Sequence, residues 1–169
     1  INYNYLPDLE KITTQTAGVF IETIQGEAGI RIADEEYFKA LREKCTKTGT
    51  LLILDEIQCG FGRTGKMFGF EHFSIVPDIL LLAKGIGGGM PIGAFISSSQ
   101  IMSVFTDNPI LGHITTFGGH PVSCAAGLAT LNTIVTENMV AEVEEKGELF
   151  KILLKHPAIK EVRGKGLML

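Results

Sequence analysis

Short, nearly continuous apolar runs alternate along the chain with longer segments in which apolar residues recur at helical spacing. The short runs have the length of strands and are apolar at almost every position, which is typical of strands buried on both faces of a sheet. They cover residues 17–22, 50–54, 78–83 and 92–97. The pattern therefore predicts a sheet that contains these four strands.

Helical spacing marks three longer segments. Residues 35–48 carry apolar side chains every three or four positions, between Asp34 as the N-cap and Gly49 as the C-cap. Residues 121–136 predict a helix rich in small residues, and residues 138–155 predict a further amphipathic helix. The helices thus lie between and after the predicted strands.

Apolar strands that alternate with helices predict an α/β fold, in which helices cover both faces of a mostly parallel sheet. Ligands of such sheets bind at the carboxyl ends of the strands. Glu22, Asp55 and Lys84 each follow an apolar run at its carboxyl end, and Gly85 and residues 87–89 let backbone or ligand approach Lys84 closely. The three residues are therefore candidates for one site, although a strand-end lysine can also extend its head into water.

The chain of 169 residues is 45% hydrophobic and 20% charged, which suits one globular domain with a sizeable core. A net charge of −4 provides no basic surface for nucleic acid or an anionic membrane. No apolar run reaches about 18 residues, so we expect no transmembrane helix. Cys45, Cys59 and Cys124 form no CxxC pair, which indicates reduced thiols and a cytoplasmic protein.

Both ends of the sequence resemble cuts through a longer chain. Ile1 is not an initiator methionine, and no signal-peptide pattern follows it. Residues 160–169 predict the start of another sheet, and the sequence stops inside this expected strand. We therefore expect an internal piece of a longer protein.

An apolar run that ends on two acids, followed by a glycine-rich loop, also resembles the site of a nucleotide hydrolase. Residues 51–56 (LLILDE) resemble a Walker B strand, and residues 60–67 nearly complete the phosphate loop GxxxxGK[ST]. However, Met67 stands where a Mg²⁺-binding hydroxyl is needed, and no apolar strand directly precedes the loop. Nucleotide hydrolysis is therefore disfavoured, as is a metal site, because the four histidines are scattered without ligand spacing.

The remaining set is a lysine, two acids and a cluster of hydroxyls and glycines at residues 113–121. This set matches the needs of pyridoxal phosphate (PLP). The cofactor's aldehyde needs a lysine for a Schiff base, its ring nitrogen needs a carboxylate, and its phosphate needs hydroxyls and backbone N–H groups.

Six motifs, in order along nearly the whole chain, resemble the class III PLP-dependent aminotransferases. They are ETIQGEAG at 22–29, DEIQCGFGRTG at 55–65, PDILLLAKG at 77–85, GGGMPIG at 87–93, TTFGG at 115–119 and VRGKGL at 162–167. The form QxGFGRTG resembles the acetylornithine, ornithine and 4-aminobutyrate transaminase branch. The resemblance implies the large domain of a fold-type-I PLP-dependent transferase.

The resemblance also implies roles for single residues. Lys84 would be the catalytic lysine that forms the Schiff base with PLP, and Asp55 would pair with the ring nitrogen. Ile57 would pack on one face of the cofactor ring, and Gln58 would hydrogen-bond near its phenolic oxygen. Glu22 would pair with a substrate-binding arginine, which no arginine of this chain evidently supplies.

Thr116 would bind the phosphate of the cofactor in the neighbouring subunit, which implies a homodimer. The resemblance divides the chain into part of the PLP-binding large domain at 1–136 and, at 137–169, a connecting helix with the start of a small C-terminal domain. Thr23 and Cys59 depart from the pattern, since proline and threonine are common at these positions.

The implied activity is the transfer of an amino group from an ω- or α-amino donor, such as acetylornithine or ornithine, to a 2-oxo acid such as 2-oxoglutarate. This is a reaction of amino-acid metabolism with small-molecule substrates, and no nucleic acid or membrane partner is expected. The alternative is a catalytically incomplete piece that acts as a structural or interaction domain.

Overall fold

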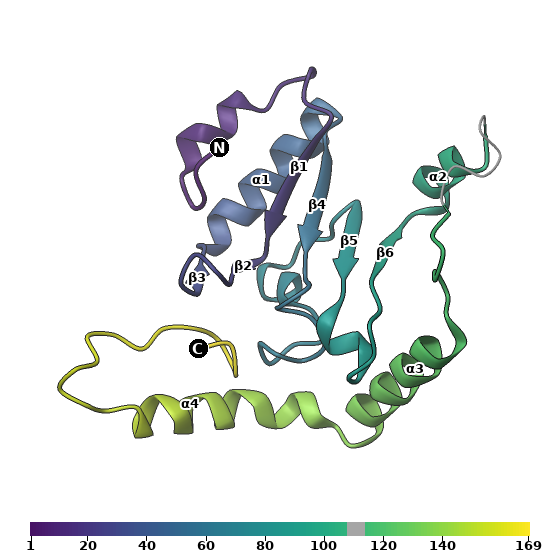
Figure 1. Ribbon diagram of the computed structural model, residues 1–169. Helices are drawn as coiled ribbons and strands as arrows, with labels where there is room; N and C mark the ends of the chain where they lie inside the picture. The colour runs from purple at the N-terminus through teal and green to yellow at the C-terminus, as the bar shows by residue number, and fades with distance from the viewer. Residues whose placement is uncertain (108–113) are drawn as a thin grey trace.

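The computed structural model describes residues 1–107 and 114–169 and contains a four-stranded sheet in the order β1-β4-β5-β6 (Figure 1). The strands β1 (Gly18–Glu22), β4 (Leu51–Asp55) and β5 (Ile79–Leu82) are parallel. The edge strand β6 (Ala94–Ser97) runs antiparallel to β5. The predicted four strands and the mostly parallel sheet are therefore confirmed.

A separate two-stranded ribbon follows β1 and consists of β2 (Ile24–Gln25) and β3 (Arg31–Ile32). Short 3₁₀ helices occupy several connections: η1 (Leu6–Lys11), η2 (Gly69–Phe73), η3 (Lys84–Gly87), η4 (Ser103–Phe105) and η5 (Met139–Glu142). The α-helices are α1 (Glu35–Thr48), α2 (Ser99–Met102), α3 (Pro121–Thr136) and α4 (Val143–Leu153). None of the helices in the described parts of the chain is long and apolar enough to cross a membrane.

Helix α1 has the predicted bounds. It starts after Asp34, whose backbone is extended although its side chain makes no capping hydrogen bond. It ends at Gly49, whose φ of 71° lies in the left-handed region that favours glycine. The single helix predicted over 138–155 is divided into η5 and α4, and Asn138, with a φ of 51°, separates both from α3.

The core lies between α1 and one face of the sheet. Alternate strand residues such as Leu52 and Leu54 are fully buried there against Phe38 and Leu41 of α1. On the opposite face, the side chain of Phe20 is 63% exposed. Helices α3 and α4 lie beyond the carboxyl ends of the strands (Figure 1).

The predicted strand over 160–169 is also wrong. The segment contains only one isolated bridge, between Lys165 and Met168, because Gly164 and Gly166 take positive φ values of 139° and 57° that interrupt an extended strand. The segment instead folds back onto the glycine-rich loop: the Leu167 N–H donates to the Arg63 carbonyl at 2.9 Å. The buried Met168 side chain contacts Cys59, with 3.7 Å between the two sulfur atoms.

Candidate active site

The strand register brings the predicted site residues to one edge of the sheet. Glu22 pairs with Asp55 across β1 and β4, and Asp55 pairs with Leu81 across β4 and β5. Lys84 follows three residues after Leu81 and begins η3. Because β1, β4 and β5 are parallel, their carboxyl ends lie at one edge of the sheet (Figure 1), and the register places Glu22, Asp55 and Lys84 at or just after these ends.

Lys84 has an unusual backbone conformation. Its φ of 47° lies in the left-handed region, which costs a non-glycine residue on the order of 1 kcal/mol. The lysine side chain is exposed and makes no hydrogen bond or ion pair with the rest of the described chain. The glycine-rich loop lies beside it, since a Cβ added to Gly85 would be 3.4 Å from the Cβ of Phe61. A primary amine is therefore held at the sheet edge without a fixed partner.

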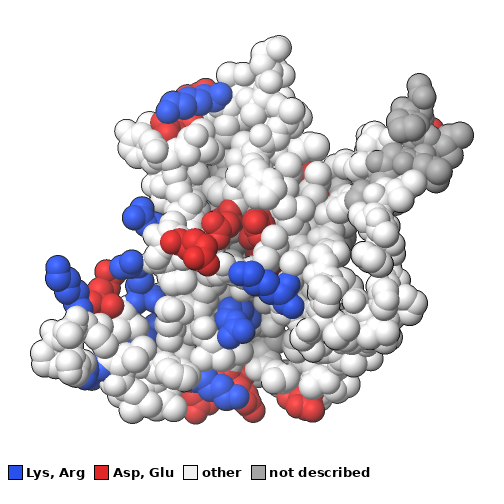
Figure 2. Space-filling model, viewed as in Figure 1, with Lys and Arg blue, Asp and Glu red and all other residues white. Residues whose placement is uncertain are grey.

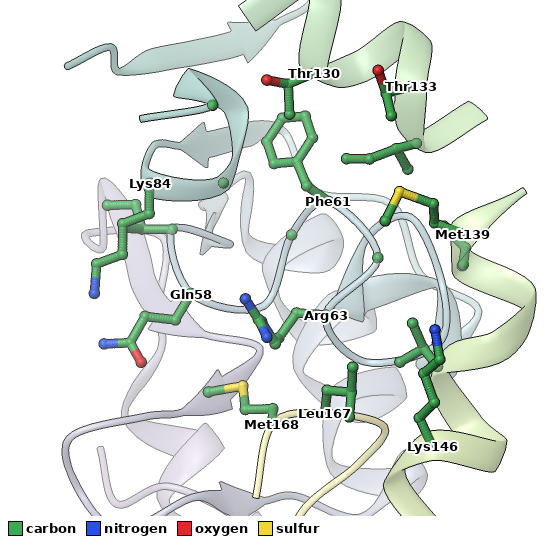
Figure 3. Close-up of a pocket in the computed structure, with 18 of the residues that line it drawn as sticks. Gln58, Phe61, Arg63, Lys84, Thr130, Thr133, Met139, Lys146, Leu167 and Met168 are labelled. Atoms are coloured by element: carbon green, nitrogen blue, oxygen red, sulfur yellow. The ribbon is translucent and has the colours of Figure 1, made fainter. Parts of the chain in front are cut away.

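A cleft of about 920 Å³ opens beside Lys84. Figure 3 shows Lys84 and Gln58 on one side of this cleft, Arg63 in its middle and Lys146 on the opposite side. Ile57 also lines the cleft. Figure 2 shows acidic and basic side chains adjoining one another on this face of the molecule. The cleft therefore combines a free amine, an amide, an apolar surface and additional positive charge.

Glu22 and Asp55 line a smaller adjacent cavity of about 260 Å³ and not the cleft of Lys84. One oxygen of each carboxylate binds local backbone: Asp55 Oδ1 accepts from the Ile57 N–H at 2.9 Å, and Glu22 Oε2 accepts from the Gly26 N–H at 2.9 Å. Within the described residues, the second oxygen of each carboxylate accepts no hydrogen bond. Each acid is thus oriented by its own loop and keeps one oxygen for another group.

Gln58 is held by the loop that follows β2. Its Nε2 donates a hydrogen bond to Glu27 Oε1 at 3.0 Å, so the nitrogen end of the amide faces Glu27. Gly26 lies directly against this side chain, and a Cβ at position 26 would overlap Gln58 Oε1. Glycine at position 26 therefore makes room for the Gln58 amide.

Glu56 is a buried acid to which sequence reasoning gave no role. Its side chain is 0% exposed and accepts hydrogen bonds from the Thr23 hydroxyl and from the Gly69 and Phe70 N–H groups. Burial raises the pKa of this carboxyl, and the three hydrogen bonds oppose the shift. Alternation along a strand could have indicated its position, because neighbours of Asp55 point to the opposite face.

Arg63 also received no role from sequence reasoning, which had found no substitute for a substrate-binding arginine. The structure places it in the cleft, where its guanidinium makes no hydrogen bond or ion pair with other described residues. Its position depends on the return of the C-terminal segment to the glycine-rich loop, and this contact between distant segments has no sequence signal.

Thr116 lies in an exposed turn that precedes α3 and does not line the cleft of Lys84. The structure therefore brings five of the six predicted site residues to one sheet edge and leaves Thr116 apart. Residue 113, at the start of the predicted hydroxyl and glycine cluster, lies outside the described residues. Across residues 1–107 and 114–169, no group of three His, Cys, Asp or Glu side chains could hold a metal ion.

Comparisons with known proteins show what this chain is similar to. The chain is 46% identical over 164 residues to acetylornithine aminotransferase of Caldanaerobacter subterraneus subsp. tengcongensis, an alignment that covers 94% of this chain and 41% of that protein. The match thus spans about two fifths of the relative's length.

Solved structures give the same result. Ornithine aminotransferase of Toxoplasma gondii matches with a TM-score of 0.90 and 36% identity, over 99% of this chain and 41% of that one. Acetylornithine aminotransferase of Elizabethkingia anophelis matches with a TM-score of 0.88 and 38% identity, over 99% of this chain and 43% of that one.

These likenesses confirm the predicted α/β fold of a fold-type-I large domain. The family described as "Aminotransferase class-III" matches residues 3–169, which is nearly the whole chain. This chain therefore belongs to the class III aminotransferases.

Proposed function

We propose that the protein carrying this chain is a PLP-dependent transaminase that moves an amino group from an acetylornithine- or ornithine-like donor to a 2-oxo acid such as 2-oxoglutarate. The observation that carries the proposal is the placement of Lys84 next to the carboxyl ends of β1 and β4, where Glu22 and Asp55 stand side by side. The donors follow the names of the similar proteins, which are acetylornithine and ornithine aminotransferases.

The residues present fit PLP. Lys84 supplies an exposed amine without a partner, Asp55 keeps a carboxylate oxygen for the ring nitrogen, and Ile57 and Gln58 line the same cleft as the lysine. The similar ornithine aminotransferase of Toxoplasma gondii is described with partial occupancy of PLP at its active site. When bound, PLP supplies an electron sink for the breaking of a bond at the amine-bearing carbon.

The chain's own residues then have distinct tasks. Lys84 would hold the cofactor covalently, and its amine would move a proton at the donor's amine-bearing carbon. Asp55 would keep the ring nitrogen protonated by supplying a nearby negative charge. Gln58 would donate toward the ring's phenolic oxygen, while the apolar Ile57 would exclude water from one ring face.

Glu22 and Thr116 have tasks that involve groups outside this site. The free oxygen of Glu22 pairs with an arginine of the substrate site, and this pair adjusts the site to substrates of different charge. Thr116 would bind the cofactor phosphate of the neighbouring subunit in a homodimer, and its exposure in a turn away from Lys84 supports such a contact. A monomeric and fully active protein would contradict this role.

We also propose that residues 1–136 belong to the PLP-binding large domain and that residues 137–169 form a connecting helix with the start of a small domain. The left-handed Asn138 at the end of α3 supports this boundary. Cys45, Cys59 and Cys124 are all free, which supports a cytoplasmic location.

The proposal is tested on the full-length protein loaded with PLP. Acetylornithine, ornithine and 4-aminobutyrate are offered in turn with 2-oxoglutarate, and the glutamate formed is measured. We expect at least one donor to yield glutamate and Lys84→Ala to abolish the reaction. A protein that stays colourless after cofactor soaking and forms no glutamate would overturn the proposal and favour a structural or interaction domain.

A further inference from the structure

A second pair of residues stands directly behind the two candidate acids. Thr23 follows Glu22, and Glu56 follows Asp55. Whereas Glu22 and Asp55 line a cavity, Thr23 and Glu56 are both 0% exposed. The Thr23 hydroxyl donates to Glu56 Oε1 at 2.5 Å, a short distance that is typical of a hydrogen bond to a carboxylate.

The Glu56 side chain also ties these strand ends to a third segment. Its Oε1 accepts from the Phe70 N–H at 2.8 Å, and its Oε2 accepts from the Gly69 N–H at 2.8 Å. Both donors lie at the start of η2, where a Cβ on Gly69 would be only 3.1 Å from Glu56 Oε1. The carboxylate thus replaces its lost hydration with three fixed donors, as burial of such a group requires.

The main chain of Glu56 makes two further links. Its N–H donates to the Leu81 carbonyl at 3.0 Å, on the strand that leads to Lys84. Its carbonyl accepts from the Gly60 N–H at 2.9 Å, which closes the turn that carries Ile57 and Gln58. One residue therefore connects every segment that brings a predicted cofactor group to the sheet edge.

We propose that the Thr23–Glu56 hydrogen bond is a positioning device that fixes the spacing of Glu22 and Asp55. The inference rests on the proposed function, because it assigns the effect of this spacing to PLP binding and turnover. Thr23 and Glu56 touch neither cofactor nor substrate and act through their neighbours. Since a small misplacement of a catalytic group lowers rates strongly, the loss of one such bond is measurable in kcat.

The test compares Thr23→Val, which keeps the side-chain shape but removes the donor, with Thr23→Ser, which keeps the hydroxyl. Both variants are made in the full-length protein. In the valine variant we expect about a 10-fold lower kcat and about a 5-fold higher Kd for PLP. The Kd is measured by absorbance titration. The serine variant is expected to stay within about 2-fold of wild type in both quantities.

Hydrogen exchange is also measured on the protein without PLP. Hydrogen exchange of the PLP-free protein is expected to be faster in peptides that cover residues 22–26 and 55–60 of the valine variant, but unchanged in the serine variant. A merely structural role would lower the melting temperature while the folded protein kept its PLP affinity and kcat. If Thr23→Val fails to fold, Glu56→Gln is tested in its place. Glutamine has only one acceptor oxygen, so it cannot accept hydrogen bonds from the Gly69 N–H, the Phe70 N–H and the Thr23 hydroxyl together.

Three results would overturn the inference: a folded valine variant with wild-type PLP affinity and kcat, a serine variant that loses as much as valine does, or a Glu56→Gln variant with unchanged PLP affinity. These failures differ from a failure of the proposed function. If the wild-type protein itself binds no PLP, both the proposed function and the inference fail. If wild type binds PLP normally and one of these three results is found, only the inference fails.

Discussion

Glu22 and Asp55 pair directly in the register of two parallel strands, so that two carboxylates stand side by side where the sheet ends. Each is oriented by a backbone N–H two or four residues further along the chain. Their neighbours Thr23 and Glu56 face the interior and hydrogen-bond to each other. Strand alternation thus produces one half-buried acidic pair at the sheet edge and one fully buried pair directly behind it.

Asp55→Asn tests the role of Asp55. An asparagine keeps the size of the side chain but provides no negative charge for a protonated ring nitrogen. We expect kcat to fall by about 10²-fold or more, with a change in melting temperature of only a few degrees. Asp34→Asn, at an exposed position outside the cleft, is the matched control and should keep its rate. Wild-type turnover in Asp55→Asn would remove Asp55 from the proposed site.

Gly26→Ala tests the position of Gln58. The added Cβ would overlap Gln58 Oε1, so the amide must leave its place beside Glu27. Because only the end of a flexible side chain has to move, we expect a stability loss below about 1 kcal/mol but a several-fold higher Kd for PLP. Gly93→Ala is the control, since its Cβ would meet only the Leu82 carbonyl at 3.7 Å. Equal PLP affinities in the two variants would show that Gln58 does not bind the cofactor.

Asp78 joins helix α1 to the sheet. Its Oδ2 accepts from Arg42 at 2.8 Å and from the Leu52 N–H at 2.7 Å. Asp78→Ala leaves the buried Leu52 N–H unpaired and removes the ion-pair partner of Arg42, so it should lower the free energy of unfolding by about 2 kcal/mol in urea denaturation. Lys39→Ala, which removes only an exposed ion pair with Glu35, should stay within about 0.5 kcal/mol of wild type. A similar loss in both variants would refute the anchoring role.

The buried Glu56 should make stability depend on pH. Burial raises its pKa above the ordinary value of 4.5, so the folded state binds the proton more tightly than the unfolded state. Its contribution is therefore complete below about pH 4.5 and is lost as the pH rises through the folded-state pKa. The stability difference between wild type and Glu56→Gln should be largest near pH 4.5 and shrink toward neutral pH. Urea denaturation of both proteins across this range measures it, and a difference that grows with pH would contradict the shift.

Local signals in the sequence predicted part of the fold well. Helix α1 has its predicted bounds because helical spacing and the left-handed Gly49 act within the segment itself. The sequence also located Glu22, Asp55 and Lys84 at strand ends, since a buried strand ends where its apolar run ends. These features depend on residues close together in the chain.

Features that depend on distant contacts were missed. An apolar run has no direction, so the antiparallel pairing of β6 could not be predicted from it. The segment 160–169 has the composition of a strand, but its Met168 side chain is buried against Cys59 and its main chain binds Arg63. For the same reason, the sequence did not indicate that Arg63 lines the cleft of Lys84.

The central claim is that Lys84 holds PLP covalently, and borohydride reduction followed by peptide mapping tests it most directly. Reduction of the PLP-loaded full-length protein turns the lysine–cofactor linkage into a stable C–N bond. We predict a pyridoxyl label on the peptide that contains Lys84, its loss in Lys84→Ala and its retention in Lys66→Ala, where an exposed lysine of the glycine-rich loop is removed. A label on another lysine, or no label on wild-type protein, would contradict the account.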